Sequence, residues 1–244
     1  LRYRKDQTGR LRESIRRGIS ATITIKPIIM KVGIIGSGIV GQVLAKAFHA
    51  EGHQVLLGTR DVQKEELKKF ITENPEIRVA VFEQAASFAE IIVLATGGAV
   101  TLDAIRLTGI AHFSGKIVID TTNPISKEAP ENGVLKYFSS LNRSLFEDIQ
   151  QLLPEAKLVK AFNSVGNAFM YKPSFPGGKP TMFICGNDDT AKSTVTSILT
   201  AFGWESEDMG KAESARAIEP LCILWCIPGF IHNQWTHAFK LLKA

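Results

Sequence analysis

The chain has 244 residues, of which 45% are hydrophobic and 22% charged, ordinary values for a globular protein that can bury a core. Its formal net charge of +5 is unevenly spread: residues 1–29 hold eight Lys or Arg against two Asp or Glu, which leaves the remainder at about −1. A folded body this close to neutral argues against a nucleic-acid function.

Residues 1–29 do not look like part of the fold. They are rich in Arg, show no clear apolar period and stop just before Met30, where the first predicted strand is about to begin. We expect a disordered or non-native basic extension and a natural start at Met30, with an Arg-rich targeting peptide as the alternative.

The cysteines and the longest apolar run argue against a disulfide-rich protein, a metal site and a membrane span. Three cysteines are too few for a disulfide scaffold and favour a reducing, cytoplasmic setting. Cys222 and Cys226 have an i, i+4 spacing that would suit a metal, but no His or second Cys pair stands nearby, so we expect apolar packing and no metal. The run from Leu221 to Ile231 is about half of a bilayer span and contains Pro228-Gly229, so no membrane span is expected.

The first predicted elements form a dinucleotide-binding fingerprint. A strand at 31–35 leads into six residues of glycine-rich turn, and a helix at 42–51 and a strand at 54–57 follow. The first glycine permits the tight turn, the second lets the backbone approach a pyrophosphate, and the third lets the helix pack on the strand. This strand–turn–helix context is what confirms such a motif. The predicted phosphate loop is Gly36, Ser37, Gly38, Ile39, Val40 and Gly41.

The tip of the second strand indicates which dinucleotide binds. An NAD site usually has Asp or Glu there to hold the ribose 2′-hydroxyl, whereas this chain has Thr59-Arg60. A hydroxyl and a guanidinium suit a 2′-phosphate, and Lys64 would share the face of Arg60 if Asp61 opens a helix. The pattern favours NADP(H) over NAD; the alternatives are a solvated charged turn and a ribose contact from Asp61.

Strand and helix patterns alternate along the rest of the chain. Strands are predicted at 78–82, 91–95, 116–120, 157–162, 181–185 and 204–209, and helices at 83–89, 101–110, 141–153, 190–202 and 212–224. The alternation predicts an α/β fold with a doubly wound parallel sheet, a Rossmann domain over residues 30–188. Residues 189–244 are predicted to form a small helical and strand extension that closes the cleft or makes a homodimer face.

Ligands of such sheets bind at the carboxyl ends of the strands, near the switch in strand order. The residues at these ends are therefore candidate site residues, although strand ends carry turn residues in any protein. Besides the glycine loop and Thr59-Arg60 they are Thr96, Asn123, Asn163, Ser164 and, closing the same stretch, Asn167.

The chain offers no recognisable acid–base machinery. We find no nucleophile elbow, no metal-spaced His and Cys cluster and no pair of carboxylates that the sequence nominates. Hydride transfer between two bound cofactors needs mainly positioning, because the cofactors carry the chemistry. Thr96 and Asn163 would then frame the transfer site, with no certain catalytic residue.

These motifs together resemble a known family. The chain is similar, from Met30 to about Phe230, to the NADPH-dependent oxidoreductases related to coenzyme F420:NADP oxidoreductase, and to the cytosolic NADPH-binding domain of six-transmembrane metalloreductases. The resemblance rests on the glycine loop, 57–60, 120–124, 159–163, 184–188 and 217–221.

The resemblance implies roles for named residues. Ser37, Ile39 and Val40 would line the phosphate loop, while Thr59, Arg60 and Lys64 would hold the 2′-phosphate. Ala95-Thr96 would lie against the nicotinamide, and Asn163-Ser164-Val165 would help form the floor for a second, flavin-like ring. The deazaflavin enzyme has His where Asn163 stands, and this departure bears on the choice of acceptor.

The sequence thus predicts an NADPH-dependent oxidoreductase that passes hydride between NADP(H) and coenzyme F420, FMN or FAD. A small-molecule or cofactor acceptor is expected as the partner. The alternatives are a non-catalytic NADPH-binding module that senses redox state and an imine or hydroxy-acid reductase. The last normally needs a long helical second domain, for which too few residues follow Asp189.

Overall fold

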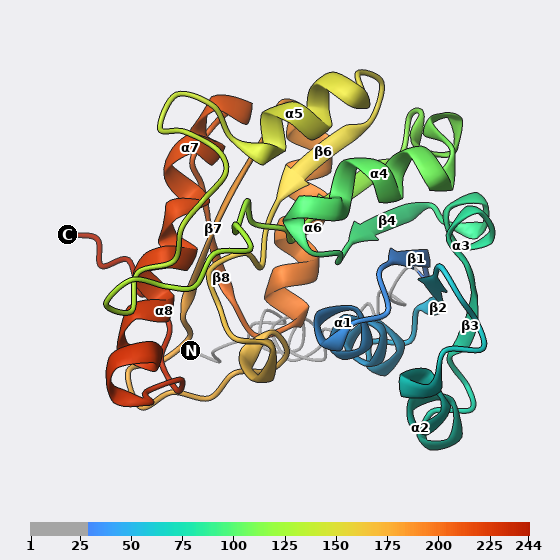
Figure 1. Ribbon diagram of the computed structural model, residues 1–244, viewed down its shortest axis with the longest axis horizontal. Helices are drawn as coiled ribbons and strands as arrows, with labels where there is room; N and C mark the ends of the chain where they lie inside the picture. Colours follow the sequence, from blue (N-terminus) through green and yellow to red (C-terminus); the bar gives the residue numbers. More distant parts are fainter. Residues whose placement is uncertain (1–28) are drawn as a thin grey trace, which may run out of the picture.

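The computed structural model describes residues 29–244, so the basic extension predicted at 1–29 lies outside the described residues except for its last position. Within residues 29–244 eight strands form one sheet, in the order β3-β2-β1-β4-β5-β6-β7-β8 (Figure 1). The strands are β1 (Lys31–Ile35), β2 (Gln54–Thr59), β3 (Arg78–Val81), β4 (Ile91–Leu94), β5 (Ile117–Asp120), β6 (Lys157–Lys160), β7 (Thr181–Gly186) and β8 (Glu205–Asp208).

Helices cover both faces of this sheet, because its central strands, such as β1 and β4, are apolar on both sides. The helices are α1 (Ile39–Ala50), α2 (Glu65–Glu73), α3 (Phe82–Phe88), α4 (Gly98–Thr108), α5 (Leu145–Leu152), α6 (Asp189–Ala201), α7 (Ala215–Ile218) and α8 (Pro220–His232), with short 3₁₀ turns η2 (Ile110–Phe113), η3 (Asn167–Phe169) and η4 (Ala212–Ser214). One apolar core lies between the sheet and α1, α2 and α6, and the other lies between the sheet and α3, α4, α5 and α7. The predicted doubly wound α/β fold is confirmed.

The strand order places the reversal beside β1. From β1 the chain builds β2 and β3 on one side, and then it crosses to β4 and continues outward on the other side. Both β2 and β4 pair with β1 in parallel. The carboxyl ends of β1 and β4 therefore flank the crevice in which sheets of this type bind ligands.

One strand departs from the parallel prediction. β7 pairs with β6 in the antiparallel direction, while β8 runs parallel to β7. A parallel crossover is usually made by a helix. Between β6 and β7 the described helical structure is limited to the three residues of η3, and β7 runs in the opposite direction to β6.

The C-terminal segment belongs partly to the sheet. Beyond the predicted boundary at residue 188, α6 packs on the sheet and β8 extends it by one strand, and the division at this point stays a prediction. The backbone N–H of Thr181 at the start of β7 donates to the carbonyl of Phe239, which ties the chain end to β7.

The last helix is longer than the sequence indicated. The helical stretch Ala212–His232 has the length and apolar character of a membrane span by composition alone: an 18-residue window within it has a mean hydropathy of 1.3, and 33% of that window is buried. The expected break at Pro228 does not end α8. Its exposed Leu224, Phe230 and Ile231 lie where the sequence suggested a dimer face, which stays a prediction.

Candidate functional site

A cavity of about 790 Å³ lies at the carboxyl ends of β1, β2 and β4. This volume is within the usual range for a pocket that holds a small molecule or cofactor, about 300–1,000 Å³. The N-terminus of α4 contributes to its wall, and Gly38, the residue that caps α1, lies at its edge. The lining residues are Gly36, Ser37, Gly38, Thr59, Arg60, Asp61, Lys64, Phe82, Ala95, Thr96, Gly97, Val100, Asp103, Ala104 and Leu107.

The glycine loop has the geometry that the three glycines predict. Gly36 has φ +126°, and a Cβ there would lie 2.4 Å from the carbonyl oxygen of Ala95. A Cβ on Gly41 would lie 1.8 Å from the carbonyl oxygen of Gly36, so Gly41 permits the close contact of α1 with β1 but does not line the cavity. A Cβ on Gly38 would meet nothing within 4 Å. Open space therefore lies beside the backbone at the N-terminus of α1, where backbone N–H groups attract anions.

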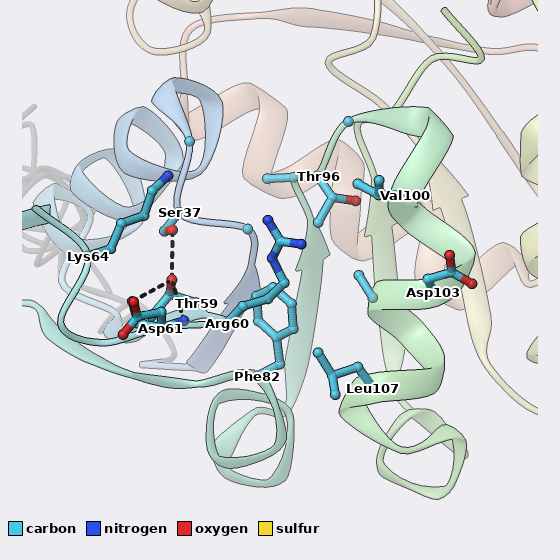
Figure 2. A pocket seen from close by; sticks show the side chains of 15 residues that line it. Ser37, Thr59, Arg60, Asp61, Lys64, Phe82, Thr96, Val100, Asp103 and Leu107 are labelled. Carbon is cyan, nitrogen blue, oxygen red and sulfur yellow. Dashed lines mark hydrogen bonds between the residues drawn. The ribbon is translucent and has the colours of Figure 1, made fainter. Parts of the chain in front are cut away.

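Two cationic side chains and a hydroxyl pair mark the end of β2. The Ser37 hydroxyl donates to Thr59 Oγ1 at 3.0 Å, and the Thr59 hydroxyl donates to the carbonyl of Asp61 at 3.1 Å. Figure 2 shows Arg60 and Lys64 reaching toward the cavity from the two sides of this pair. Among residues 29–244, Arg60 has no carboxylate within ion-pair distance, and Lys64 has only an exposed contact of 3.9 Å with Glu66. Both charges are therefore available to an anionic group.

The helix that was expected to align Arg60 with Lys64 starts later than predicted. α2 begins at Glu65, with Lys64 as its N-cap residue. The Asp61 side chain accepts from the backbone N–H of Gln63 at 2.8 Å, which favours a turn over a helix at this point. Lys64 reaches the cavity because of this turn and not because of a shared helical face.

The apolar wall of this cavity was not predicted from the sequence. Val100, Ala104 and Leu107 of α4 and Phe82 at the start of α3 form it (Figure 2). Their i, i+4, i+7 spacing on α4 is a signal that could have indicated one face of the helix. Leu107 is 63% exposed, so its apolar side chain is accessible to a ligand in this cavity.

A second cavity of about 410 Å³ continues along the glycine loop on the far side of Thr96. It shares Gly38, Ala95, Thr96, Gly97 and Val100 with the first cavity, so the two form one elongated site. Its other lining residues are Ile39, Val40, Gly98, Ala99, Thr121, Thr122, Asn123 and Ile125. Ile39, Val40 and Asn123 were predicted site residues.

Thr96 has a defined hydrogen-bonding role. Its Oγ1 lies 2.9 Å from Thr101 Oγ1, and the Thr101 hydroxyl donates to the carbonyl of Gly97 at 3.1 Å. Because the Thr101 proton is already committed to Gly97, Thr96 donates to Thr101, and the two lone pairs of Thr96 Oγ1 stay available as acceptors.

Asn123 stands at the site, and Asn163 lies directly behind it. The Asn123 amide donates to the carbonyl of Asn163 at 2.7 Å, and the Asn163 amide donates to Asn123 Oδ1 at 3.2 Å and to the carbonyl of Ile218 at 2.9 Å. Asn163 is 3% exposed and lines neither cavity. Its Oδ1 is buried with no hydrogen-bond partner among the described residues.

The remaining predicted residues lie in the loop after β6. Ser164 and Val165 are buried and Asn167 is half-buried, and none of the three lines either cavity. Phe162, directly before Asn163, is buried with φ +62°, a left-handed conformation that a residue with a Cβ rarely adopts. The fold thus holds Asn163 in place at the expense of backbone strain at Phe162. The loop supports Asn123 from the side away from the cavity.

The charged groups of the described residues do not suggest a metal. Within residues 29–244, no group of three or more His, Cys, Asp or Glu side chains could hold a metal ion. Cys222 is buried, Cys226 is half-buried, and both are free thiols.

Comparison with known proteins defines the family of this chain. Residues 31–124 match the family described as NADP oxidoreductase, coenzyme F420-dependent. A solved structure from Arthrobacter sp. FB24, named as a candidate F420-dependent NADP reductase, is 32% identical with a TM-score of 0.82, over 88% of this chain and 100% of the other. The chain belongs to the coenzyme F420-dependent NADP oxidoreductase family. The family resemblance found in the sequence is confirmed.

The chain is also similar to two curated proteins with different names. The rat metalloreductase STEAP3 is 31% identical over 81% of this chain, which spans only 38% of that protein. The F420-dependent NADP reductase of Methanothermobacter thermautotrophicus is 26% identical over 81% of this chain and 88% of its own length. The family is one of NADP-dependent oxidoreductases, and the chain is similar both to a protein named as a metalloreductase and to one named as an F420-dependent NADP reductase.

Proposed function

We propose that this protein is an NADPH-dependent oxidoreductase that transfers hydride between NADP(H) and a second ring, either the deazaflavin coenzyme F420 or a flavin (FMN or FAD). The observation that carries the proposal is the group formed by Arg60, Lys64 and the Ser37–Thr59 hydroxyl pair at the end of β2. It stands inside an elongated cavity that follows a glycine loop, where an NAD site would present a carboxylate to the ribose.

The residues of the first cavity fit the adenosine half of NADP(H). A 2′-phosphate would meet the planar donor fork of Arg60 and the ammonium of Lys64, and the Ser37 hydroxyl would donate to it after turning away from Thr59 Oγ1. The exposed apolar wall of α4 with Phe82 would cover the adenine. The pyrophosphate would pass Gly38, where the missing Cβ leaves open space beside the N-terminus of α1.

The second cavity fits the nicotinamide half. When bound, the nicotinamide supplies the hydride chemistry. Thr96 offers an acceptor lone pair and Asn123 a side-chain amide to the carboxamide and ribose, while Ile39 and Val40 supply apolar surface that excludes water. The protein's contribution is therefore orientation of the two rings, which is the dominant requirement for transfer between cofactors.

The test is NADPH oxidation by purified protein with coenzyme F420, FMN and FAD as separate acceptors, and with NADH as the control donor. Turnover with one acceptor and a strong preference for NADPH is the expected result. Tight NADPH binding without turnover on any of the three would refute hydride transfer to these rings and favour a non-catalytic, redox-sensing module.

A further inference from the structure

Three charged side chains are fully buried behind the second cavity. Lys160 on β6 and Asp120 on β5 are 0% exposed, and Glu219, between α7 and α8, is 1% exposed. The Lys160 ammonium donates to Asp120 Oδ2 at 2.8 Å, to Glu219 Oε1 at 3.0 Å and to the carbonyl of Thr122 at 2.5 Å. All three ammonium protons are therefore used.

The carboxylates of this network are equally well satisfied. Asp120 Oδ1 accepts from the backbone N–H and the hydroxyl of Thr122, at 2.9 and 2.7 Å. Glu219 accepts from the backbone N–H groups of Leu145 and Phe146 at the start of α5, at 3.1 and 3.0 Å. The two carboxylates outweigh the effect of burial, so the pKa of Lys160 lies above its ordinary value and the lysine stays charged.

Stability alone does not explain these groups, because a well-packed apolar cluster of similar size is commonly as stable as a buried ion network. The network instead holds one segment of the cavity wall in a fixed position. It fixes the backbone of Thr122, and both Thr122 and Asn123 line the second cavity. A parallel link runs from Asn123 through the Asn163 amide to the carbonyl of Ile218.

We propose that Lys160, Asp120 and Glu219, together with Asn163, are positioning residues that fasten the helical stretch 212–232 to the nicotinamide-side wall of the site. The two links join the same two segments, Thr122-Asn123 and Ile218-Glu219, which lie about a hundred residues apart in the chain. This inference rests on the proposed function. In it, the C-terminal helices hold the wall that positions the nicotinamide.

The two halves of the cofactor should respond differently to the loss of these residues. None of the four residues lines the first cavity, where the adenosine and its 2′-phosphate would bind. The fragment 2′,5′-ADP carries that half only. A loss of positioning at the far wall should therefore weaken NADPH and leave 2′,5′-ADP unaffected, whereas a general loss of structure should weaken both.

The experiment is calorimetric titration of NADPH and 2′,5′-ADP into wild type and Glu219→Gln, with thermal melting to establish that each is folded. Glu219→Gln keeps the size of the side chain and removes its charge. We expect the Kd of NADPH to rise about tenfold, equivalent to about 1.4 kcal/mol, and that of 2′,5′-ADP to stay within about twofold. If Glu219→Gln does not fold, Asn163→Ala breaks the second link without removing a charge and should give the same split.

The matched control is Arg216→Gln. Arg216 on α7 forms an ion pair with Glu147 on α5, so this change also loosens the C-terminal stretch but leaves both links to the cavity wall intact. Its NADPH affinity should match that of wild type. Equal weakening of both ligands in Glu219→Gln, or no change in either, would overturn the inference. Wild-type protein that bound neither ligand would refute the proposed function and this inference with it.

Discussion

Replacement of Arg60 by Ala tests the choice of dinucleotide most directly. Arg60 lies in the cavity and is exposed, and among residues 29–244 no carboxylate neutralises it. A hydrogen bond to a charged group is worth about 1.5–3 kcal/mol, and solvent screening at an exposed site favours the lower end. We therefore expect Arg60→Ala to raise the Kd of NADPH by about 10- to 30-fold, since each 1.4 kcal/mol corresponds to a factor of ten.

The effect must depend on the 2′-phosphate. The Kd of NADH, which lacks this group, should change by less than about twofold, because only the 2′-phosphate is predicted to accept from the guanidinium. Titration of both cofactors by the quenching of protein fluorescence or by calorimetry measures the two constants. The affinity of wild type for NADPH should also fall more steeply with salt than that of the variant.

Arg78→Ala is the matched control for this prediction. Arg78 is an exposed arginine at the first position of β3, at the end of the strand away from the cavity, so its removal changes the net charge equally. It should leave both constants unchanged. If Arg60→Ala raised the Kd of NADPH and the Kd of NADH equally, the arginine would support the cavity without binding the 2′-phosphate, and the reasoning would be wrong.

Three further predictions concern the loop, the transfer site and stability in acid. Gly41→Ala places a Cβ 1.8 Å from the backbone oxygen of Gly36, so it should cost about 3 kcal/mol or more of unfolding free energy, visible as a lower Tm, and abolish NADPH binding. Asn123→Ala should lower kcat by about 10²-fold while 2′,5′-ADP still binds, as steady-state kinetics and calorimetry would show. Arg216 lowers the pKa of Glu147 from 4.5 to about 2, so the stability from this pair is present above about pH 4.5 and is lost as the pH falls toward 2; melting of Glu147→Gln over this window should show a shallower loss of Tm.

The identity of the hydride acceptor is open after the comparisons with known proteins. Relatives of this chain include two proteins named for coenzyme F420 and one named as a metalloreductase, so membership in the family leaves the acceptor open. Asn163, which the sequence comparison with the deazaflavin enzyme singled out, lies behind Asn123 and not on a cavity wall. NADPH oxidation with F420, FMN and FAD as separate acceptors is therefore the more decisive experiment. Substitutions intended to change the preferred acceptor would be made at Asn123, which lines the second cavity.

Local rules were sufficient for β1, the glycine loop, α1 and the end of β2. The strand, glycine loop and helix from β1 to α1 follow from residues that are neighbours in sequence, since a tight turn, a close backbone contact and a helix N-terminus are all local requirements. The same holds for Thr59 and Arg60, which directly end β2. The position of Lys64 was predicted from a helix that starts four residues later than assumed, because a local side-chain turn at Asp61 competes with it.

What the sequence by itself determined was the alternation of strands and helices, the glycine loop and the charge at the end of β2, since each depends on periodicity or on adjacent residues. Only the tertiary structure decided which strand tips meet. It joined Lys160 to Asp120 across paired strands and to Glu219 across a helix junction 59 residues away, it placed Asn123 on the wall with Asn163 behind it, and it turned β7 antiparallel. Contacts of this kind depend on the register of distant segments and on the burial of charge, and neither is written in any short stretch of sequence.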